Sequence, residues 1–371
     1  MNKRILVGVP PKHHVLLSYD EINGLSALGY TCRPVLYGQN NSSLNKITKL
    51  LGVIGRAINI VKELYRFKPH ILYLNSRFEP VGTTRDFITA LVVNLLYIRK
   101  LKIVIKTHGS DVSILESQSF FYKQVVVPYL VKHIDAWFFL SNEEKEMIRQ
   151  YNPALASKIF ITSNIVDPDR SVASLEFRKK YLLDDNRFKV LFVGRIVREK
   201  GVFSLLQSIP LLDCKEDYLF LFVGDGPDLK ELIQLSEKLK VSAYTRFLGF
   251  IPDEECDHFY ANVDILAFPT FFNEGFPMAL FKSIAAGLPV ITTQIRAAKD
   301  HLTAPDNVLW VDGESPESVA EAIAALYKDN GLRQSMSQNN RRIAQKFTRE
   351  HVCMEMSEVM LSIYDTPATT I

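Results

Sequence analysis

The stretch Lys189–Gly201, KVLFVGRIVREKG, decides the fold. Its first five residues are rich in apolar and β-branched side chains and have the length of a buried strand. Gly194 follows directly, a basic turn comes next, and a helix is expected to begin near Val202. A strand, a glycine turn and a helix in this order are typical of a βαβ unit, which pairs its strands in parallel.

The same alternation of short apolar runs and longer helical patterns extends over the whole chain. The runs expected to form strands are Ile5–Val9, Cys32–Leu36, Ile71–Leu74, Ile103–Lys106, Ala136–Leu140, Ile159–Thr162, Lys189–Val193, Tyr218–Val223, Phe247–Leu248, Ile265–Phe268, Val290–Thr293 and Val308–Trp310. The helical patterns include Leu44–Phe67, Asp86–Ile98, Ser318–Lys328, Leu332–Phe347 and Val352–Tyr364. Such alternation predicts parallel sheets with helices on both faces.

The alternation pauses over Asn164–Asn186, where we place a domain boundary. A chain of 371 residues is long for one domain and suits two. We therefore predict an α/β protein with two doubly wound, Rossmann-like domains over residues 1–170 and 171–350, and a C-terminal helix over 351–371 that packs back on the first domain. The two domains are expected to face a central cleft, because ligands bind at the carboxyl ends of the strands in such sheets.

Charge is divided unevenly along the chain. Residues 1–180 hold 25 Lys and Arg against 14 Asp and Glu, whereas the remaining residues hold 19 against 27. A basic first half is expected if that half meets an anionic membrane surface, and ordinary variation in surface charge would produce the same counts. Both interpretations stay open at this point.

No stretch of the sequence has the pattern of a signal peptide or a membrane span. The apolar run at the N-terminus is too short for a signal peptide, and Phe87–Ile98 has about half the ~20 residues of a spanning helix. Four scattered cysteines without a Cys-x-x-Cys pair indicate neither a disulfide framework nor a zinc site. These features predict a cytoplasmic protein that could rest on the inner face of the cell membrane.

The turn after the strand Lys189–Val193 is basic and includes Arg195 and Lys200. An arginine and a lysine at a strand end can both reach one diphosphate, and Gly194 lets the backbone come close to a ligand. The two cations would neutralise the charge that grows on a diphosphate as a glycosidic bond breaks. A solvated basic turn would contain the same residues, so this motif alone does not separate the two interpretations.

A second stretch, Phe268–Lys282, begins where the strand Ile265–Phe268 ends. Pro277 suits the first turn of a helix, and the backbone N–H groups from Gly275 onward would then be free to bind a phosphate or sugar oxygen. Glu274 could accept hydrogen bonds from sugar hydroxyls. It could equally be a carboxylate favoured at a helix start by the helix dipole.

Five motifs together resemble glycosyltransferase family 4, whose members have the two-domain GT-B fold. They follow one another at family-like spacing through the second half: Gly194-Arg195 with Lys200-Gly201, Phe222–Pro227, Phe247–Ile251, Glu274–Pro277 and Ala285–Val290. The resemblance implies transfer of a sugar, with retention of its anomeric configuration, from a nucleotide-sugar on the C-terminal domain to an acceptor on the N-terminal domain.

The resemblance also implies the residues of the site. Its predicted catalytic residues are His108, Glu274, Arg195 and Lys200. Its predicted donor-binding residues are Gly8, Gly194, Arg195, Lys200, Gly249, Phe250, Ile251, Glu274, Gly275, Phe276, Pro277, Met278, Ala279 and Lys282. The diphosphate would lie on Arg195 and Lys200, and the sugar on the loop of Glu274.

The first half resembles the family more faintly, through Thr107-His108-Gly109-Ser110-Asp111. His108 would hydrogen-bond the donor sugar or an acceptor oxygen. A lone histidine is more often structural, but its place in a His-Gly-x-Asp sequence at a strand end favours a functional role. Ser141 and Asn164 also stand at family-like positions.

The sequence departs from the family at three places. Lys282 stands where the family usually has a second glutamate that holds the ribose, and an ammonium can donate but not accept. The glycine-rich loop after the first strand is replaced by Gly8–His14. Ile165 replaces the glycine that usually follows Asn164, a change that does not touch the chemistry.

Two patterns mimic other kinds of site. Asp167-Pro168-Asp169 has the Asp-x-Asp pattern of metal-dependent glycosyltransferases, but it lies at the domain boundary and far in sequence from the donor motifs. Gly224-Asp225-Gly226 begins like a dinucleotide fingerprint, but Leu229 stands where the third glycine belongs. We therefore expect no metal and no cofactor beyond the nucleotide-sugar.

The sequence as a whole predicts a metal-independent, retaining hexosyltransferase. Its acceptor is expected to be a growing surface polysaccharide or a lipid-linked oligosaccharide, with peripheral contact to an anionic membrane and no nucleic acid partner. Lys282 and the missing glycine loop leave open a catalytically weak binding or scaffold subunit. A nucleotide-sugar epimerase of the same fold is a third alternative.

Overall fold

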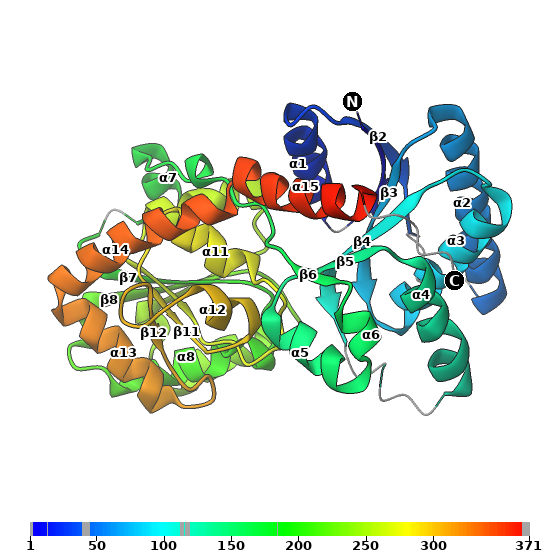
Figure 1. The fold of residues 1–371 in the computed structure, drawn as a ribbon. Helices are drawn as coiled ribbons and strands as arrows, with labels where there is room; N and C mark the ends of the chain where they lie inside the picture. The colour runs from blue at the N-terminus through cyan, green and yellow to red at the C-terminus, as the bar shows by residue number, and fades with distance from the viewer. Residues whose placement is uncertain are drawn as a thin grey trace. The chain divides into compact units, whose positions relative to one another are not determined.

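The structure, a computed structural model, describes residues 3–12, 14–38, 45–111, 115, 119–183 and 185–365. The chain divides into two compact units (Figure 1), here called unit 1 (Met1–Ile165 and Arg349–Ile371) and unit 2 (Val166–Thr348). The sequence placed these divisions a few residues later. Each unit contains a six-stranded, all-parallel sheet, which confirms the prediction of two doubly wound α/β domains.

The sheet of unit 1 has the order β2-β1-β3-β4-β5-β6. Its strands are β1 (Arg4–Val9), β2 (Thr31–Leu36), β3 (Ile71–Phe78), β4 (Lys102–Ser110), β5 (Ala136–Phe139) and β6 (Ile159–Ile161). Strand order reverses between β1 and β3, so the carboxyl ends of these two strands mark the point where ligands bind in such sheets.

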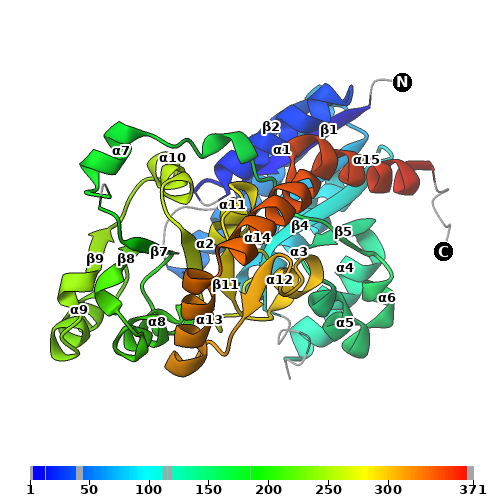
Figure 2. The ribbon, with the colours of Figure 1, turned by 90° about the vertical axis from the view of Figure 1, so that its left-hand side faces the viewer.

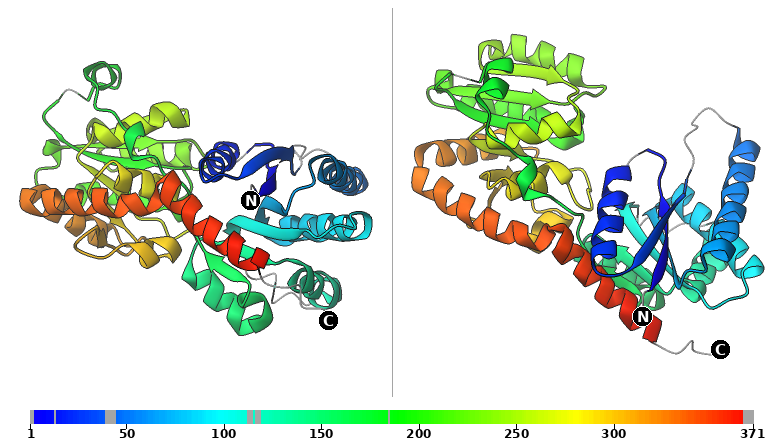
Figure 3. Two further views of the ribbon diagram at one scale, coloured as in Figure 1. Left: turned by 45° about the horizontal axis from the view of Figure 1, so that its top comes forward. Right: turned by 90° about the horizontal axis from the view of Figure 1, so that it is seen from above.

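Helices cover both faces of this sheet. Those of unit 1 are α1 (Val15–Ala27), α2 (Lys46–Phe67), α3 (Pro80–Leu96), the π-helix η2 (Tyr122–Val126), α4 (Val127–His133), α5 (Asn142–Tyr151), α6 (Pro153–Ala156) and α15 (Arg349–Asp365). Ile5 and Val7 lie in one apolar cluster with residues of α1 and α15, whereas Leu6 lies in the cluster that contains residues of α2, α3 and α4. Figure 3 shows α15, in red, beside the blue α1.

A buried ion pair joins α1 to β4 in unit 1. The Lys106 Nζ lies 2.7 Å from the Glu21 Oε1, and the two side chains are 0% and 1% exposed. Lys106 also donates to the carbonyl of Ser163 at 2.9 Å, and the Tyr73 hydroxyl donates to Glu21 Oε2 at 2.8 Å. Each charge is thus compensated by its partner and by further hydrogen bonds, as burial of an ion pair requires.

The sheet of unit 2 has the order β12-β11-β10-β7-β8-β9, with its switch point between β7 and β10. Figure 2 shows β7, β8 and β9 of this sheet side by side. Its strands are β7 (Phe188–Val193), β8 (Tyr218–Val223), β9 (Thr245–Gly249), β10 (Ile265–Phe268), β11 (Val290–Thr292) and β12 (Val308–Trp310). Every residue of β8 is buried, because helices cover this sheet on both faces. The continuous apolar runs in the sequence have this physical origin.

The helices of unit 2 pack in pairs. α8 (Val202–Ser208) contacts α13 (Pro316–Lys328), and α11 (Met278–Ala285) contacts α14 (Asn330–Ala344). Figure 1 shows the two pairs on opposite faces of the sheet. The other helices are α7 (Leu175–Lys180), α9 (Leu229–Lys238), α10 (Asp253–Cys256) and α12 (Arg296–His301).

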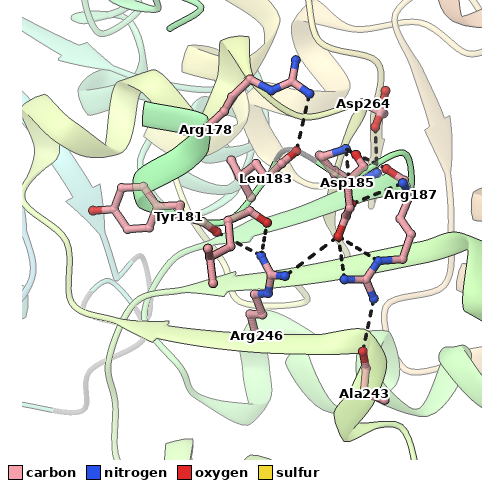
Figure 4. A network of polar contacts seen from close by, with 10 residues as sticks. Arg178, Tyr181, Leu183, Asp185, Arg187, Ala243, Arg246 and Asp264 are labelled. Carbon is pink, nitrogen blue, oxygen red and sulfur yellow. Dashed lines mark hydrogen bonds and ion pairs between the residues drawn. The ribbon is translucent and has the colours of Figure 1, made fainter. Parts of the chain in front are cut away.

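A polar network joins the segment just before β7 to residues at the amino ends of other strands of unit 2 (Figure 4). Asp185 accepts two hydrogen bonds from the Arg187 guanidinium, at 3.0 and 2.7 Å, and lies 3.9 Å from Arg246. Arg246 also donates to the carbonyl of Tyr181 at 3.0 Å, and Asp264 accepts from the backbone N–H of Lys189 at 2.7 Å. These charges lie at the end of the sheet opposite the predicted donor motifs, and their partners give them a structural role.

Two structural observations bear on the predicted membrane contact. The charge count over residues 1–180 includes Arg178, Lys179 and Lys180, which belong to α7 of unit 2 and so do not add to the positive charge of unit 1. Within the described residues, no helix combines the length and the apolar character that crossing a bilayer requires.

Candidate active site

The two motifs predicted to bind the donor meet at the switch point of unit 2. The turn with Arg195 and Lys200 follows β7, and the loop with Glu274 follows β10, the neighbouring strand. Backbone hydrogen bonds join the two loops, since the N–H groups of Phe271 and Phe272 donate to the carbonyl of Glu199 at 2.9 and 3.0 Å. The fold therefore brings together segments that lie about 75 residues apart in the sequence.

Glycines allow these loops to pack backbone against backbone. Gly201 has a φ of +73°, and a Cβ at this position would lie 2.1 Å from the carbonyl oxygen of Pro269. Gly224, after β8, has a φ of +138°, and its Cβ would lie 1.8 Å from the carbonyl oxygen of Gly194. Because a side chain at either position would collide with backbone, the loops after β7, β8 and β10 form one rigid platform.

The platform carries an ion pair between two of the predicted catalytic residues. Lys200 and Glu274 form a salt bridge and are 13% and 21% exposed. The Lys200 ammonium also lies 5.1 Å from the ring centroid of Phe272. Arg195 is exposed, and no ion pair holds its guanidinium within the described part of the chain. The carboxylate thus positions one cation, while the second is free to meet an anion.

The helix α11 begins beside this pair. It starts at Met278, one residue after Pro277, and no side chain caps its first N–H groups. Phe276, just before it, is buried and stacks on Phe281 with ring centroids 3.7 Å apart. The start of the helix is therefore held by the core while no side chain caps its N–H groups, an arrangement that favours a phosphate or sugar oxygen.

The predicted donor-binding residues Gly249, Phe250 and Ile251 lie at the end of β9 and just after it. Gly249 has a φ of +67° and accepts a hydrogen bond from the N–H of Gly224 at 2.8 Å, which ties this turn to the same platform. The side chain of Phe250 is 75% exposed, whereas Ile251 is buried. An exposed aromatic ring on a fixed turn can stack on a nucleotide base.

Gly8 does not lie in a loop. It is a buried residue inside β1 of unit 1, and a Cβ at this position would lie 2.8 Å from Leu74 Cδ2 and 3.1 Å from the Cβ of Tyr37. The structure thus gives Gly8 a packing role within the sheet, and its contact with the donor stays a prediction.

Lys282 forms an ion pair with another residue of unit 2. Its ammonium lies 2.7 Å from the Asp257 Oδ1, and the two side chains are 19% and 5% exposed. The sequence predicted Lys282 as a donor-binding residue in place of the usual glutamate. Asp257 compensates the charge of Lys282, and the contact of Lys282 with the donor stays a prediction. No sequence pattern pointed to Asp257 as its partner.

We expect Lys282→Ala to destabilise the protein more than it weakens donor binding. Removal of the ammonium leaves the Asp257 carboxylate buried without its partner, which costs roughly 3 kcal/mol for pairs of this kind. A double variant, Lys282→Met with Asp257→Asn, removes both charges and should recover most of the loss. Urea unfolding and donor KM, measured on all three proteins, check this. A large rise in donor KM at unchanged stability would instead place Lys282 in the donor site.

His108 lies near the end of β4 in unit 1, at the pocket described below. Its Nε2 lies 2.7 Å from the Asn75 Oδ1, and its ring stacks on that of His14 with centroids 4.6 Å apart. Burial is the main reason that the pKa of His108 lies well below its usual value, and the neighbouring His14 and Lys106 lower this pKa further. The imidazole is therefore neutral near pH 7 and can exchange hydrogen bonds with a hydroxyl.

Ser141 in unit 1 and Asp167 in unit 2 have local partners, whereas the buried Oδ1 of Asn164 has no hydrogen-bond partner among the described residues. Ser141 caps α5, accepting from the N–H of Glu144 at 3.3 Å and donating to its carboxylate at 2.9 Å. In unit 2, Asp167 accepts from the backbone N–H of Asp169 at 3.0 Å, which is a turn interaction.

Thr270 was not predicted, although its buried hydroxyl donates to the Glu199 carbonyl at 3.2 Å and so helps to join the two donor loops.

Solved structures share this architecture over almost the full chain. A glycosyltransferase of Rickettsia africae superimposes with a TM-score of 0.78 at 17% identity, covering 99% of this chain and 100% of that one. HepE of Anabaena in complex with UDP-glucose gives a TM-score of 0.74 at 16% identity, covering 98% and 100%. This is the GT-B fold. At these identities, the likeness establishes the GT-B fold alone.

Sequence comparisons match parts of the chain to known glycosyltransferases. Residues 174–343 match the family model of glycosyl transferases group 1. CapM of Staphylococcus aureus, a capsular polysaccharide biosynthesis glycosyltransferase, is 27% identical over 299 residues, 77% of this chain and 73% of its own length. An uncharacterized glycosyltransferase of Methanocaldococcus jannaschii is 24% identical over 186 residues, so the match spans about half of each protein. These matches support a GT-B glycosyltransferase.

Proposed function

We propose that the protein is a retaining, metal-independent glycosyltransferase. It transfers a hexose-type sugar from a nucleotide-sugar on unit 2 to a surface polysaccharide or lipid-linked oligosaccharide. The observation that carries the proposal is the platform at the switch point of unit 2, where Arg195, the Lys200–Glu274 pair and the uncapped start of α11 are joined. Cations and free N–H groups at one place suit a diphosphate and its sugar.

The names of similar proteins support the donor and acceptor classes. HepE was solved with UDP-glucose, and CapM is named for capsular polysaccharide biosynthesis. Both names are consistent with a nucleotide-sugar donor and a polysaccharide acceptor for this chain.

The proposed reaction uses the departing diphosphate as its base. The acceptor hydroxyl attacks the anomeric carbon from the face that the diphosphate leaves, the bond from that carbon to the phosphate oxygen breaks, and the hydroxyl proton passes to the diphosphate. Arg195 and Lys200 stabilise the negative charge on the leaving group. Glu274 and the neutral His108 orient sugar and acceptor hydroxyls by hydrogen bonds.

A hydrolysis assay tests this function without knowledge of the acceptor. The protein is incubated with a panel of nucleotide-sugars, with and without EDTA, and the released nucleoside diphosphate is measured. We expect slow hydrolysis of one donor at a rate unchanged by EDTA, because two basic side chains do the work of a divalent ion. Loss of activity in EDTA that manganese or magnesium restores would show a metal-dependent mechanism. Donor binding without any turnover would indicate a scaffold protein.

A further inference from the structure

Unit 1 contains a pocket of about 730 Å³ at its own switch point. The pocket is lined by the segment after β1, by the end of β3 and by His108 of β4, and α2 and α3 close its side. Its volume is that of a small-molecule site, and its position is the one at which doubly wound sheets bind ligands.

The polar part of this pocket is strongly basic. Among the described residues that line it, no carboxylate occurs, and five side chains are cationic: Lys12, Lys49, Arg56, Arg77 and Arg85. Two carboxylates lie just behind the wall, since Glu79 is 3.7 Å from Arg77 and Asp86 is 3.5 Å from Arg85. Lys12, Arg56, Arg77 and Arg85 alone outnumber these two carboxylates, which leaves a net positive charge facing the cavity.

The guanidinium of Arg85 is held in place. It donates to the Ser76 Oγ at 2.6 Å and lies 4.5 Å from the ring centroid of Tyr37. The buried Nε of Arg56 has no hydrogen-bond partner. Fixed and incompletely paired guanidinium groups in a pocket are suited to phosphate oxygens, which can each accept several N–H groups.

The other wall of the pocket is apolar and continues outside it. Leu50 and Val53 of α2 face the cavity together with Val81 and Ile88 of α3. The first turns of α2 also expose Ile47, Leu50 and Leu51, which are 71%, 48% and 62% exposed, and Val81 is 77% exposed. Residues three and four apart share one side of a helix, so these side chains form an apolar track that leads out of the pocket.

We propose that this pocket binds a phosphate or diphosphate ester of an apolar chain, with Arg56, Arg77 and Arg85 on the anion and the α2–α3 wall on the chain. The proposal rests on the proposed function, in which this ester carries the acceptor. An anion without an apolar chain would leave the apolar track without a partner, and a neutral lipid would leave the cations without one.

Equilibrium titrations of the full-length protein test the pocket with three probes: farnesyl diphosphate, inorganic pyrophosphate and farnesol. All are performed below the micelle concentration and with saturating nucleoside diphosphate, which occupies the donor site on unit 2. We expect farnesyl diphosphate to bind at least about tenfold more tightly than either other probe, because only it uses both walls. Pyrophosphate that binds as tightly as farnesyl diphosphate would overturn the role of the chain, and farnesol that does so would overturn the role of the cations.

Variants locate the binding. Arg56→Ala with Arg77→Ala should weaken farnesyl diphosphate at least about tenfold, whereas Arg66→Ala, a 72% exposed cation on the same helix α2, should not. Wild-type binding by the double variant would overturn the assignment. Nucleoside diphosphate binding to unit 2 should be unchanged in every variant. Absence of nucleotide binding in the wild type would contradict the proposed function and leave the pocket assignment to be decided by the lipid arm alone.

Discussion

Replacing Lys200 by alanine is expected to lower the turnover number about a hundredfold while the protein stays folded, and Arg195→Ala should act similarly. Each cation stabilises negative charge that is larger on the departing diphosphate than on the bound donor, and loss of one such contact commonly costs ~3 kcal/mol of activation free energy. Lys200 carries an additional role, since its salt bridge with Glu274 positions the sugar loop.

Arg198 provides a matched control for this change. It lies in the same turn, but its guanidinium pairs with Glu231 at 2.8 Å and packs 3.9 Å from the ring centroid of Phe203, away from the loop after β10. Arg198→Ala should therefore keep near-normal turnover. Steady-state kinetics on the three variants decide the matter, and normal rates for Arg195→Ala and Lys200→Ala would remove the donor-site assignment.

Lys106→Ala should cause the largest loss of stability, about 3–5 kcal/mol in the free energy of unfolding. The substitution leaves the Glu21 carboxylate, 1% exposed, without the cation that compensates its burial. The loss should appear in the urea transition of unit 1 as a lower midpoint at an unchanged slope.

Two further variants identify the cause. Lys102→Ala, in the same strand, breaks a partly exposed pair with Asp135 at 3.0 Å and should cost less than about 1 kcal/mol. The double variant Lys106→Met with Glu21→Gln removes both charges, keeps an acceptor for Tyr73, and should recover part of the stability. If Lys106→Ala is no more destabilising than Lys102→Ala, the intact Lys106–Glu21 pair is not needed for the stability of unit 1.

The strands were the most predictable part of the fold. Tyr218–Val223 and Ile265–Phe268 begin and end in the structure at the predicted residues, because strands covered on both faces need continuous apolar runs. Helix starts were less predictable. α3 begins at Pro80 and not near Asp86, since its first turn packs on the end of β3 through tertiary contacts: a Cβ on Gly82 would lie 2.1 Å from the carbonyl oxygen of Arg77.

The candidate site was predictable only where chemistry lies in a continuous motif. Arg195, Lys200 and Glu274 stood in two such motifs, and the switch point between β7 and β10 brings them together. The pairing of Lys282 with Asp257 joins α11 to a 3₁₀ turn (Asp257–Ala261) 25 residues earlier, and nothing in the local sequence marks it. The pocket cations of unit 1 come from the segment after β1 and from α2, β3 and α3, so only the fold shows that they share a cavity.

The central claim is that the platform after β7 and β10 binds the diphosphate of the donor. Its most direct test is calorimetric titration of a nucleoside diphosphate and of the matching nucleoside into the wild type and into the variant carrying both Arg195→Ala and Lys200→Ala. We predict that the wild type binds the diphosphate far more tightly than the nucleoside and that the double variant binds both with the same low affinity. Undiminished diphosphate binding by the double variant would contradict the account.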